Sequence, residues 1–329
     1  MAQIAAAFAS SHSVMLTAEL DDWLTRFVAA DQRISHFDAA GNPCTYGDLL
    51  ARASAQSAAL VTKAAIERRF DDAQAAMARM KTEILSARLD AMIIVGDDQR
   101  EIFSEMNQPA LAIYYGETIR NAAARDDLPP GEWYKRAQNR RRDPGGPVDY
   151  PCQSALGLYL IEELTRRGFD ITAIKQLGPD EAEGHAYSFV HYKYIGGSGL
   201  PIVPILLNTY YPPNQPTPER CLALGSAIAE LVRTFPAALR IGIMASGGLS
   251  HFTVDEQLDR QVIDAMRRKD MDFLAALPPR KLQAGSSEIR NWLVVAAAAA
   301  NLELSWVSYV PGYRTPALTG TGLGFARWS

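Results

Sequence analysis

Histidine is scarce in this chain, and two of its five histidines follow short apolar runs that are typical of buried β-strands. The run IAAAFASS leads into His12, and the run IGIMASGGLS leads into His251. A third run, MIIVG, is followed by Asp97, Asp98 and Gln99. Because ligands of open α/β sheets bind beyond the carboxyl ends of the strands, we expect these polar groups to meet at one site.

Each of the two histidines also has a structural interpretation. His12 could cap its strand through the neighbouring serines, and a satisfied, partly buried histidine is the commoner case for a lone residue. The Ser-Gly-Gly turn before His251 removes side-chain bulk where a ligand would approach the backbone. A functional and a structural role are therefore about equally favoured at His251.

Glu288 stands at the start of an apolar helix in the segment AGSSEIRNW, behind a Ser N-cap. An acidic residue in a first helical turn complements the helix dipole by about 0.3–1 kcal/mol without any further role. A carboxylate fixed at a helix start is equally a well-anchored metal ligand. Both interpretations of Glu288 stay open on the sequence.

Other motifs favour structural roles. His185 and His191 share the segment GHAYSFVH, whose spacing suits neither a metal-binding pair on a strand nor a zincin-type helix, so we expect at most one to line a site. The GGSG run at 196–199 lacks the Lys-Ser/Thr of a phosphate loop, and the MASGG run lacks the first Gly of a hydrolase nucleophile elbow. The three arginines at 140–142 suit a solvated loop or carboxylate capture.

Helical and strand patterns alternate along the chain, which predicts a parallel sheet covered by helices. Strands are expected at 4–11, 91–96, 202–208 and 241–250. Helices are expected at 17–31, 46–89 (one long or two abutting), 153–167, 219–235 and about 286–300. The Pro-, Gly- and Arg-rich segment 122–150 is expected to be an irregular surface excursion. Without a repeat or a linker, we predict one α/β domain over 1–329, with a mostly parallel central sheet flanked by helices.

Composition narrows the class of protein. The 329 residues are 48% hydrophobic, which is enough to bury a sizeable core, and the net charge of −4 argues against nucleic-acid or membrane-surface partners. Three scattered cysteines form neither a disulfide framework nor a zinc-binding pair. The N-terminus lacks a signal-peptide pattern and no apolar run reaches spanning length, so we expect a cytoplasmic protein.

Taken in order, these motifs resemble the class III extradiol ring-cleavage dioxygenases, of the protocatechuate 4,5-dioxygenase catalytic (beta) subunit type. The motifs that carry the resemblance are ASSH at 9–12, GDDQ at 96–99, PIVP at 201–204 with Asn208, SGGLSH at 246–251, and GSSE at 285–288. The SGGLSH segment after a strand and the G-x-x-E helix start are the specific ones. The resemblance covers essentially the whole chain.

The resemblance implies a single non-haem Fe(II) held by two histidines and a glutamate, with open positions for a catecholate and O2. By position, His12 is similar to the first histidine ligand and Glu288 to the carboxylate ligand. His251 is similar to the acid/base that moves a proton of the catechol hydroxyl, and His185 to a histidine that contacts substrate or oxygen. The family also implies a homo-oligomer.

One position departs from the family pattern. Where the family reads Asn-Asp-His, this chain reads Asp-Asp-Gln, with Gln99 at the position of the second histidine ligand. An amide oxygen is a harder and weaker donor to Fe(II) than an imidazole nitrogen. Either Gln99 is an unusual ligand, or His36 or His185 takes the position.

The resemblance thus predicts an Fe(II)-dependent dioxygenase that opens a catechol-like aromatic ring, including carboxylated rings, with O2. Two other classes stay open. A metal-dependent hydrolase or lyase on the same scaffold would turn over without oxygen. In a non-catalytic ligand-binding relative, His251→Ala would leave ligand affinity and cellular function nearly unchanged.

Overall fold

The computed structural model describes residues 1–129 and 131–329, and its centre is one nine-stranded sheet. Four parallel strands form the middle of the sheet, in the order β1 (Gln3–Ser10), β10 (Arg240–Ser246), β4 (Ala91–Asp97) and β9 (Ile202–Leu207). Beyond β9 lie β5 (Leu111–Tyr114), which is antiparallel to it, and β8 (Thr172–Ile174). The predicted α/β class, with helices flanking a mostly parallel central sheet, is confirmed.

The other edge of the sheet is an antiparallel ribbon that the sequence analysis did not include. Strand β13 (Thr319–Trp328) pairs with β1, and both β12 (Leu304–Tyr313) and β11 (His251–Thr253) pair with β13. In β13, Gly320, Gly322 and Gly324 alternate with larger residues, a period of two that the sequence analysis did not use. The ribbon matters for function because β11 begins at His251.

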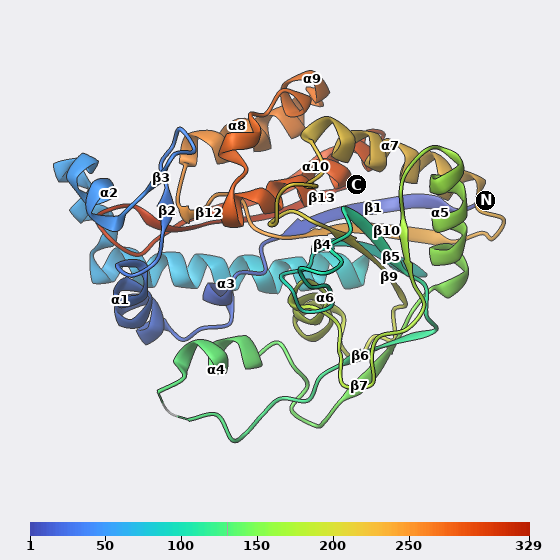
Figure 1. Cartoon of the computed structure of the whole chain (residues 1–329), viewed down its shortest axis with the longest axis horizontal. Coiled ribbons are helices and arrows are strands. Elements are labelled where there is room, and N and C mark those ends of the chain that lie inside the picture. The colour runs from blue at the N-terminus through green and yellow to red at the C-terminus, as the bar shows by residue number, and fades with distance from the viewer. Residues whose placement is uncertain (130) are drawn as a thin grey trace.

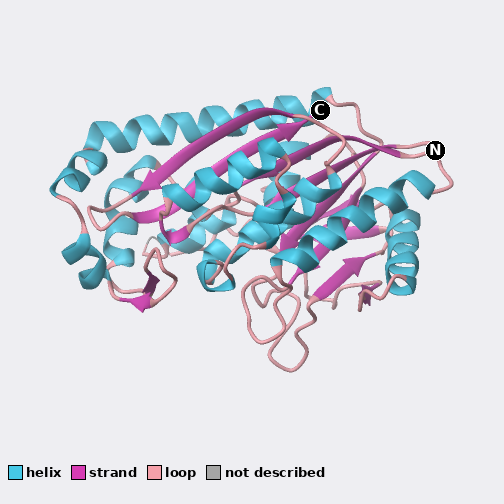
Figure 2. Ribbon diagram, turned by 90° about the horizontal axis from the view of Figure 1, so that it is seen from above, coloured by secondary structure: helices cyan, strands magenta, loops and turns pink. Residues whose placement is uncertain are grey.

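Helices cover both faces of the sheet (Figures 1 and 2). One face carries α5 (Ser154–Arg166), α7 (Pro218–Thr234), α8 (Glu256–Arg268), α9 (Met271–Ala275) and α10 (Ile289–Ala298). The opposite face carries α1 (Phe27–Asp31), the long α3 (Lys63–Ser86) and α6 (His185–Val190). Successive strand residues point to opposite faces, so Ile93 packs in one core and Ile94 in the other.

Shorter elements complete the chain. A hairpin of β2 (His36–Phe37) and β3 (Pro43–Cys44) precedes α2 (Tyr46–Arg52), and a 3-10 turn at Ala55–Val61 separates α2 from α3. The expected helix at 17–31 is shorter, a π-helical turn at Asp22–Arg26 followed by α1. Among the described residues no helix is both long and apolar enough to cross a bilayer.

The expectation of an irregular segment at 122–150 was wrong in part. Residues Trp133–Asn139 form α4, and β7 (Val148–Pro151) pairs with β6 (Thr118–Asn121) in a separate hairpin. In α4, Trp133 packs edge-on against Phe27 with ring centroids 4.8 Å apart. This contact is tertiary and leaves no local periodicity to detect. Pro130, in the same segment, lies outside the described residues.

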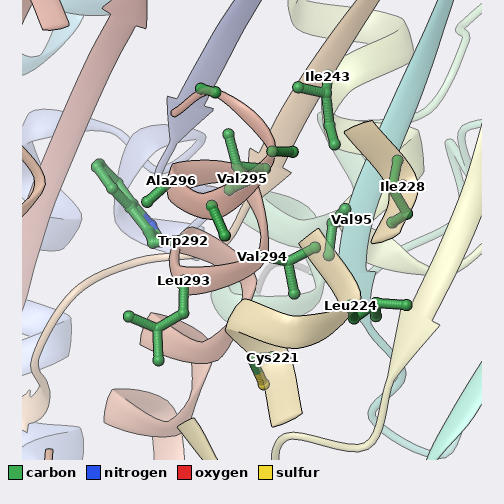
Figure 3. Packing of buried hydrophobic residues seen from close by; sticks show 14 of the residues in the cluster. Val95, Cys221, Leu224, Ile228, Ile243, Trp292, Leu293, Val294, Val295 and Ala296 are labelled. Atoms are coloured by element: carbon green, nitrogen blue, oxygen red, sulfur yellow. The ribbon is translucent and has the colours of Figure 1, made fainter. Parts of the chain in front are cut away.

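Helices α7 and α10 pack closely because a glycine lies at their contact. Figure 3 shows Leu224 and Ile228 of α7 and Val294 and Val295 of α10 in one buried cluster with the strand residues Val95 and Ile243. A Cβ at Gly225 would lie 2.0 Å from the backbone oxygen of Val294. Any larger residue must therefore push the two helices apart, and α10 is the helix that follows Glu288.

We expect Gly225→Ala to lower the free energy of unfolding by about 1–3 kcal/mol, because the added methyl group overpacks the α7–α10 contact. Denaturant unfolding followed by circular dichroism measures the loss. The matched control is Gly47→Ala in α2, where the nearest atom would be 3.7 Å away. Gly47→Ala should be neutral or stabilising by up to ~1 kcal/mol. Equal effects at both positions would contradict the packing argument.

Candidate metal centre and active site

The carboxyl ends of three neighbouring parallel strands meet at one edge of the sheet. The register pairs Ser10 of β1 with Ser246 of β10, and Ala245 of β10 with Val95 of β4. Residues just beyond these strands therefore surround a common cavity of about 220 Å³. Its walls include His12, Gln99, Glu101, Tyr134, Arg141, His185, Tyr210, His251, Phe252 and Glu288.

Four of the buried side chains near this cavity could hold a metal ion. One ligand atom from each of His12, Asp97, His185 and Glu288 lies within 4.8 Å of the others. The Nε2 atom of His12 is 3.1 Å from Nε2 of His185, 3.4 Å from Oε2 of Glu288 and 3.8 Å from Oδ1 of Asp97. All four residues are at most 7% exposed.

The tautomer of His12 follows from its hydrogen bonds. Ser246 donates its hydroxyl proton to the backbone oxygen of Ala186 at 2.6 Å. The hydroxyl oxygen of Ser246 must therefore accept from Nδ1 of His12, which lies 3.0 Å away. Nδ1 of His12 therefore carries a proton. Its Nε2 presents a lone pair to the other three ligand atoms.

His185 is held in the same way by a carboxylate. Its Nδ1 lies 2.7 Å from Oε2 of Glu101, and the backbone N–H of His185 donates to the same oxygen. The other oxygen of Glu101, Oε1, accepts from Arg141 at 3.4 Å. Burial disfavours the imidazolium, but Glu101 and Asp97 outweigh it and raise the pKa of His185 to about 9. A positive charge, either a proton or a metal cation, must lie between the two facing Nε2 atoms of His12 and His185.

The two carboxylates differ in their surroundings. Burial and the neighbouring Glu288 raise the pKa of Asp97, whose Oδ1 has no hydrogen-bond partner among the described residues. Glu288 accepts from the backbone N–H of Gly248 at 2.6 Å. Burial favours its neutral acid, but His12 and His251 outweigh burial and lower the pKa of Glu288 to about 2. Imidazole nitrogens with an unpartnered carboxylate oxygen are a donor set that fits a divalent transition metal.

His251 lies beside this group as a neutral base. Its backbone N–H donates to the hydroxyl of Ser286 at 2.8 Å, and its Nδ1 donates to the backbone oxygen of Leu249 at 2.9 Å. Nε2 is thus unprotonated in the neutral ring and lies 4.0 Å from Oε2 of Glu288. Burial lowers the pKa of His251, so the ring is uncharged at neutral pH and the lone pair of Nε2 is available to accept a proton.

A buried carboxyl of α8 anchors the turn that carries His251. Asp259 accepts from both the backbone N–H and the hydroxyl of Ser250, at 2.8 and 2.6 Å, and from the hydroxyl of Tyr309 at 2.7 Å. Burial raises the pKa of Asp259 to about 7 in spite of these hydrogen bonds. The residue before His251 is therefore fixed from α8 and β12 together.

The structure brings most of the predicted site residues together. His12, His185 and Glu288 share the four-residue group, and His251 lines the same cavity. Gln99 also lines it, but its amide nitrogen donates to Oδ2 of Asp97 at 3.1 Å. Of the two other histidines, His36 lies elsewhere, with Nε2 2.8 Å from the backbone oxygen of Asp31. His191 is stacked on Tyr150 and bonded to Glu183.

Sequence reasoning assigned no metal-ligand or catalytic role to three residues of the site. Asp97 was placed at the strand end but was not named as a metal ligand, although a carboxylate as the last residue of a buried strand is a signal. Glu101 carried no local signal, and Arg141 was noted only as one of three arginines at 140–142 that suit a solvated loop or carboxylate capture. Each reaches the site through a contact with a distant segment, Glu101 with α6 and Arg141 with Glu101.

The comparisons with known proteins identify a family for this chain. Residues 146–324 match the family described as the catalytic LigB subunit of aromatic ring-opening dioxygenase. The match spans more than half of the 329 residues, and the chain belongs to this family. The matched range contains His185, His251 and Glu288, whereas His12 and Asp97 precede it.

Two individual proteins are also similar. Over 132 residues the chain is 28% identical to the gallate dioxygenase of Pseudomonas putida, an alignment covering 36% of this chain and 37% of that enzyme. The chain thus spans little more than a third of that relative's length. Among solved structures, an uncharacterized protein from Escherichia coli K12 superposes with a TM-score of 0.41 at 14% identity, over 75% of this chain and 91% of that chain.

We expect Asp259→Asn to remove a pH dependence of stability. The folded-state pKa of Asp259, about 7, exceeds its ordinary value of 3.8, so its contribution is fully present below pH ~4 and is lost as pH rises to ~7. The free energy of unfolding of the wild type should therefore fall by about a few kcal/mol over this pH range because of Asp259. Denaturant unfolding of the wild type and the variant from pH 4 to 8 measures it.

The control for Asp259 is Asp264→Asn, since Asp264 lies on the same helix, is exposed and pairs with Arg267. Asp264→Asn should leave the pH slope of the free energy of unfolding unchanged. Parallel pH profiles for the wild type and Asp259→Asn would show that the buried carboxyl is not the source.

Proposed function

We propose that this protein is an Fe(II)-dependent extradiol-type dioxygenase that opens the ring of a catechol-like aromatic with O2. Family membership supports ring opening in general terms. The observation that carries the proposal is the buried group of His12, His185, Asp97 and Glu288 beside the neutral base His251. A general acid/base next to a metal-ligand group is what proton-coupled catechol chemistry requires.

His12 and Glu288 would hold the iron, each already oriented by the protein. Ser246 fixes the ring of His12 with Nε2 facing the group, and Gly248 fixes the carboxylate of Glu288. When bound, Fe(II) supplies the electronic connection between an aromatic diol and dioxygen. The protein's own contribution is orientation, since hydrogen bonds hold both side chains where they stand, His12 just beyond β1 and Glu288 at the end of the 3-10 turn before α10.

His251 would take the proton of a catechol hydroxyl. Its Nδ1 is committed to Leu249, so only Nε2 can accept a proton from the cavity. Burial keeps the ring neutral before substrate binds, and the nearby carboxylate of Glu288 stabilises the imidazolium that then forms. The same nitrogen can return the proton to an oxygen atom of the opening ring.

Arg141 favours a ring that carries a carboxylate. Its side chain is 12% exposed in the cavity wall, and its hydrogen bond to Glu101 is long, at 3.4 Å. A guanidinium has five N–H donors in a planar fork that matches a carboxylate. The donors of Arg141 not directed at Glu101 can therefore receive an anionic substituent, which narrows the substrate class to carboxylated catechols.

The direct test is oxygen uptake by the anaerobically prepared, Fe(II)-loaded protein on a panel of catechols, with detection of the yellow ring-opened product. We expect His251→Ala to lower kcat by about 10²–10⁴-fold while the iron content stays unchanged, because the base is lost and the ligands are kept. The control His36→Gln alters a buried histidine outside the cavity and should retain activity.

Two results would contradict the proposed reaction. Fe(II)-loaded wild type that consumes no oxygen with any catechol of the panel would exclude ring opening for these substrates. Turnover of a substrate under anaerobic conditions would favour the hydrolase or lyase chemistry instead.

We expect Arg141→Met to lower kcat/KM selectively for carboxylated substrates. A charge-assisted hydrogen bond contributes about 1.5–3 kcal/mol, so kcat/KM should fall roughly 10- to 150-fold for a carboxylated catechol relative to an unsubstituted one. Arg142→Met is the neighbouring control and should leave the ratio unchanged. An equal loss for both substrates would mean that Arg141 acts only by supporting Glu101.

A further inference from the structure

The metal-ligand group contains two donors beyond His12 and Glu288. We propose that the metal is held by two histidines and two carboxylates, His12, His185, Asp97 and Glu288, and that Gln99 is a positioning residue acting through Asp97. This inference rests on the proposed metal site but not on the oxygen chemistry.

Asp97 lies where a metal ligand would lie, and one of its carboxylate oxygens is available to bind a metal. It is the last residue of β4 and is fully buried, and its two carboxylate oxygens lie 3.8 Å from Nε2 of His12 and of His185, respectively. Oδ1 has no hydrogen-bond partner among the described residues. A buried carboxylate oxygen without a partner is costly, and a cation between Asp97 and the two imidazoles removes that cost.

His185 is oriented in the manner of a metal-binding histidine. Such histidines donate the N–H that faces away from the metal to a carboxylate or a carbonyl group. Nδ1 of His185 makes this bond to Glu101 at 2.7 Å, and Nε2 faces Nε2 of His12 at 3.1 Å. Arg141 holds Glu101 from its other oxygen, so the ring of His185 is fixed by two successive contacts.

The side chain of Gln99 is not oriented as a metal ligand. Its amide nitrogen donates to Oδ2 of Asp97 at 3.1 Å, and an amide N–H has no lone pair for a metal. This hydrogen bond occupies Oδ2 and leaves Oδ1 directed at the group. The donor that the family pattern places at position 99 is thus replaced by a carboxylate two residues earlier and a histidine from α6.

The first test measures metal affinity in the full-length chain. Anaerobic calorimetric titration with Fe(II) should give one site in the wild type, and Asp97→Asn and His185→Ala should each weaken the affinity by at least ~10- to 100-fold, the loss typical of removing even an outer-shell partner. The control His36→Gln should bind as the wild type does. Unchanged affinity in either Asp97→Asn or His185→Ala would overturn the four-ligand set.

A double-mutant cycle tests the role of Gln99. If Gln99 acts through Asp97, Gln99→Ala weakens Fe(II) binding in the wild type but causes no further loss in the Asp97→Asn background. If Gln99 were itself a ligand, its replacement would cost the same factor in both backgrounds. That second result would overturn its assignment as a positioning residue.

A measurement on the wild type avoids variants that fail to fold. Pulsed electron paramagnetic resonance of the Mn(II)-loaded protein counts coordinated imidazole nitrogens. We expect two, from His12 and His185, and a count of one would overturn the proposal. Wild type that shows two imidazoles but no oxygen uptake with catechols would overturn the dioxygenase function alone. Ring opening together with a single imidazole would overturn the ligand set alone.

Discussion

The structure depends on a positive charge at the carboxyl ends of its central strands. Two imidazole nitrogens face each other at 3.1 Å, and a buried carboxylate oxygen next to them has no hydrogen-bond partner among the described residues. Without a cation, this arrangement would place lone pairs and negative charge together in a medium of low polarity, which is strongly unfavourable. A proton on His185 or a divalent metal supplies the charge, and the rest of the site is organised to keep these donors in place.

The supporting contacts come from all parts of the fold. Ser246 fixes the ring of His12, Glu101 fixes the ring of His185, and Gly248 fixes the carboxylate of Glu288. The antiparallel ribbon contributes β11, which begins at His251, while Asp259 holds the preceding residue. Ligands and base are therefore positioned by elements from opposite ends of the chain. This explains why a family match limited to residues 146–324 includes only part of the site.

Much of the fold and part of the site could be predicted from residue patterns. Buried parallel strands leave continuous apolar runs, so β1, β4 and β9 were predicted close to their observed bounds, whereas β10 was expected to reach 250 and ends at Ser246. The sequence analysis missed α4, where Trp133 packs against Phe27, and the C-terminal ribbon, where β13 pairs with β1. The same distinction holds for the site. His12, Glu288 and His251 were named as ligands or base, whereas Arg141 was noted only within the 140–142 run and Glu101 was not noted.

By itself, the sequence determined which donors stand at strand and helix ends, since apolar periodicity and turn residues mark those ends locally. It determined the family resemblance and the departure at Gln99 in the same way. Only the tertiary structure decided which donors face one another, because ring tautomers and carboxylate orientation depend on hydrogen bonds between segments far apart in the chain. For this reason Asp97 became a candidate ligand, and His185 was preferred to His36, only when β4 and α6 were seen together, with Gln99 directed at Asp97.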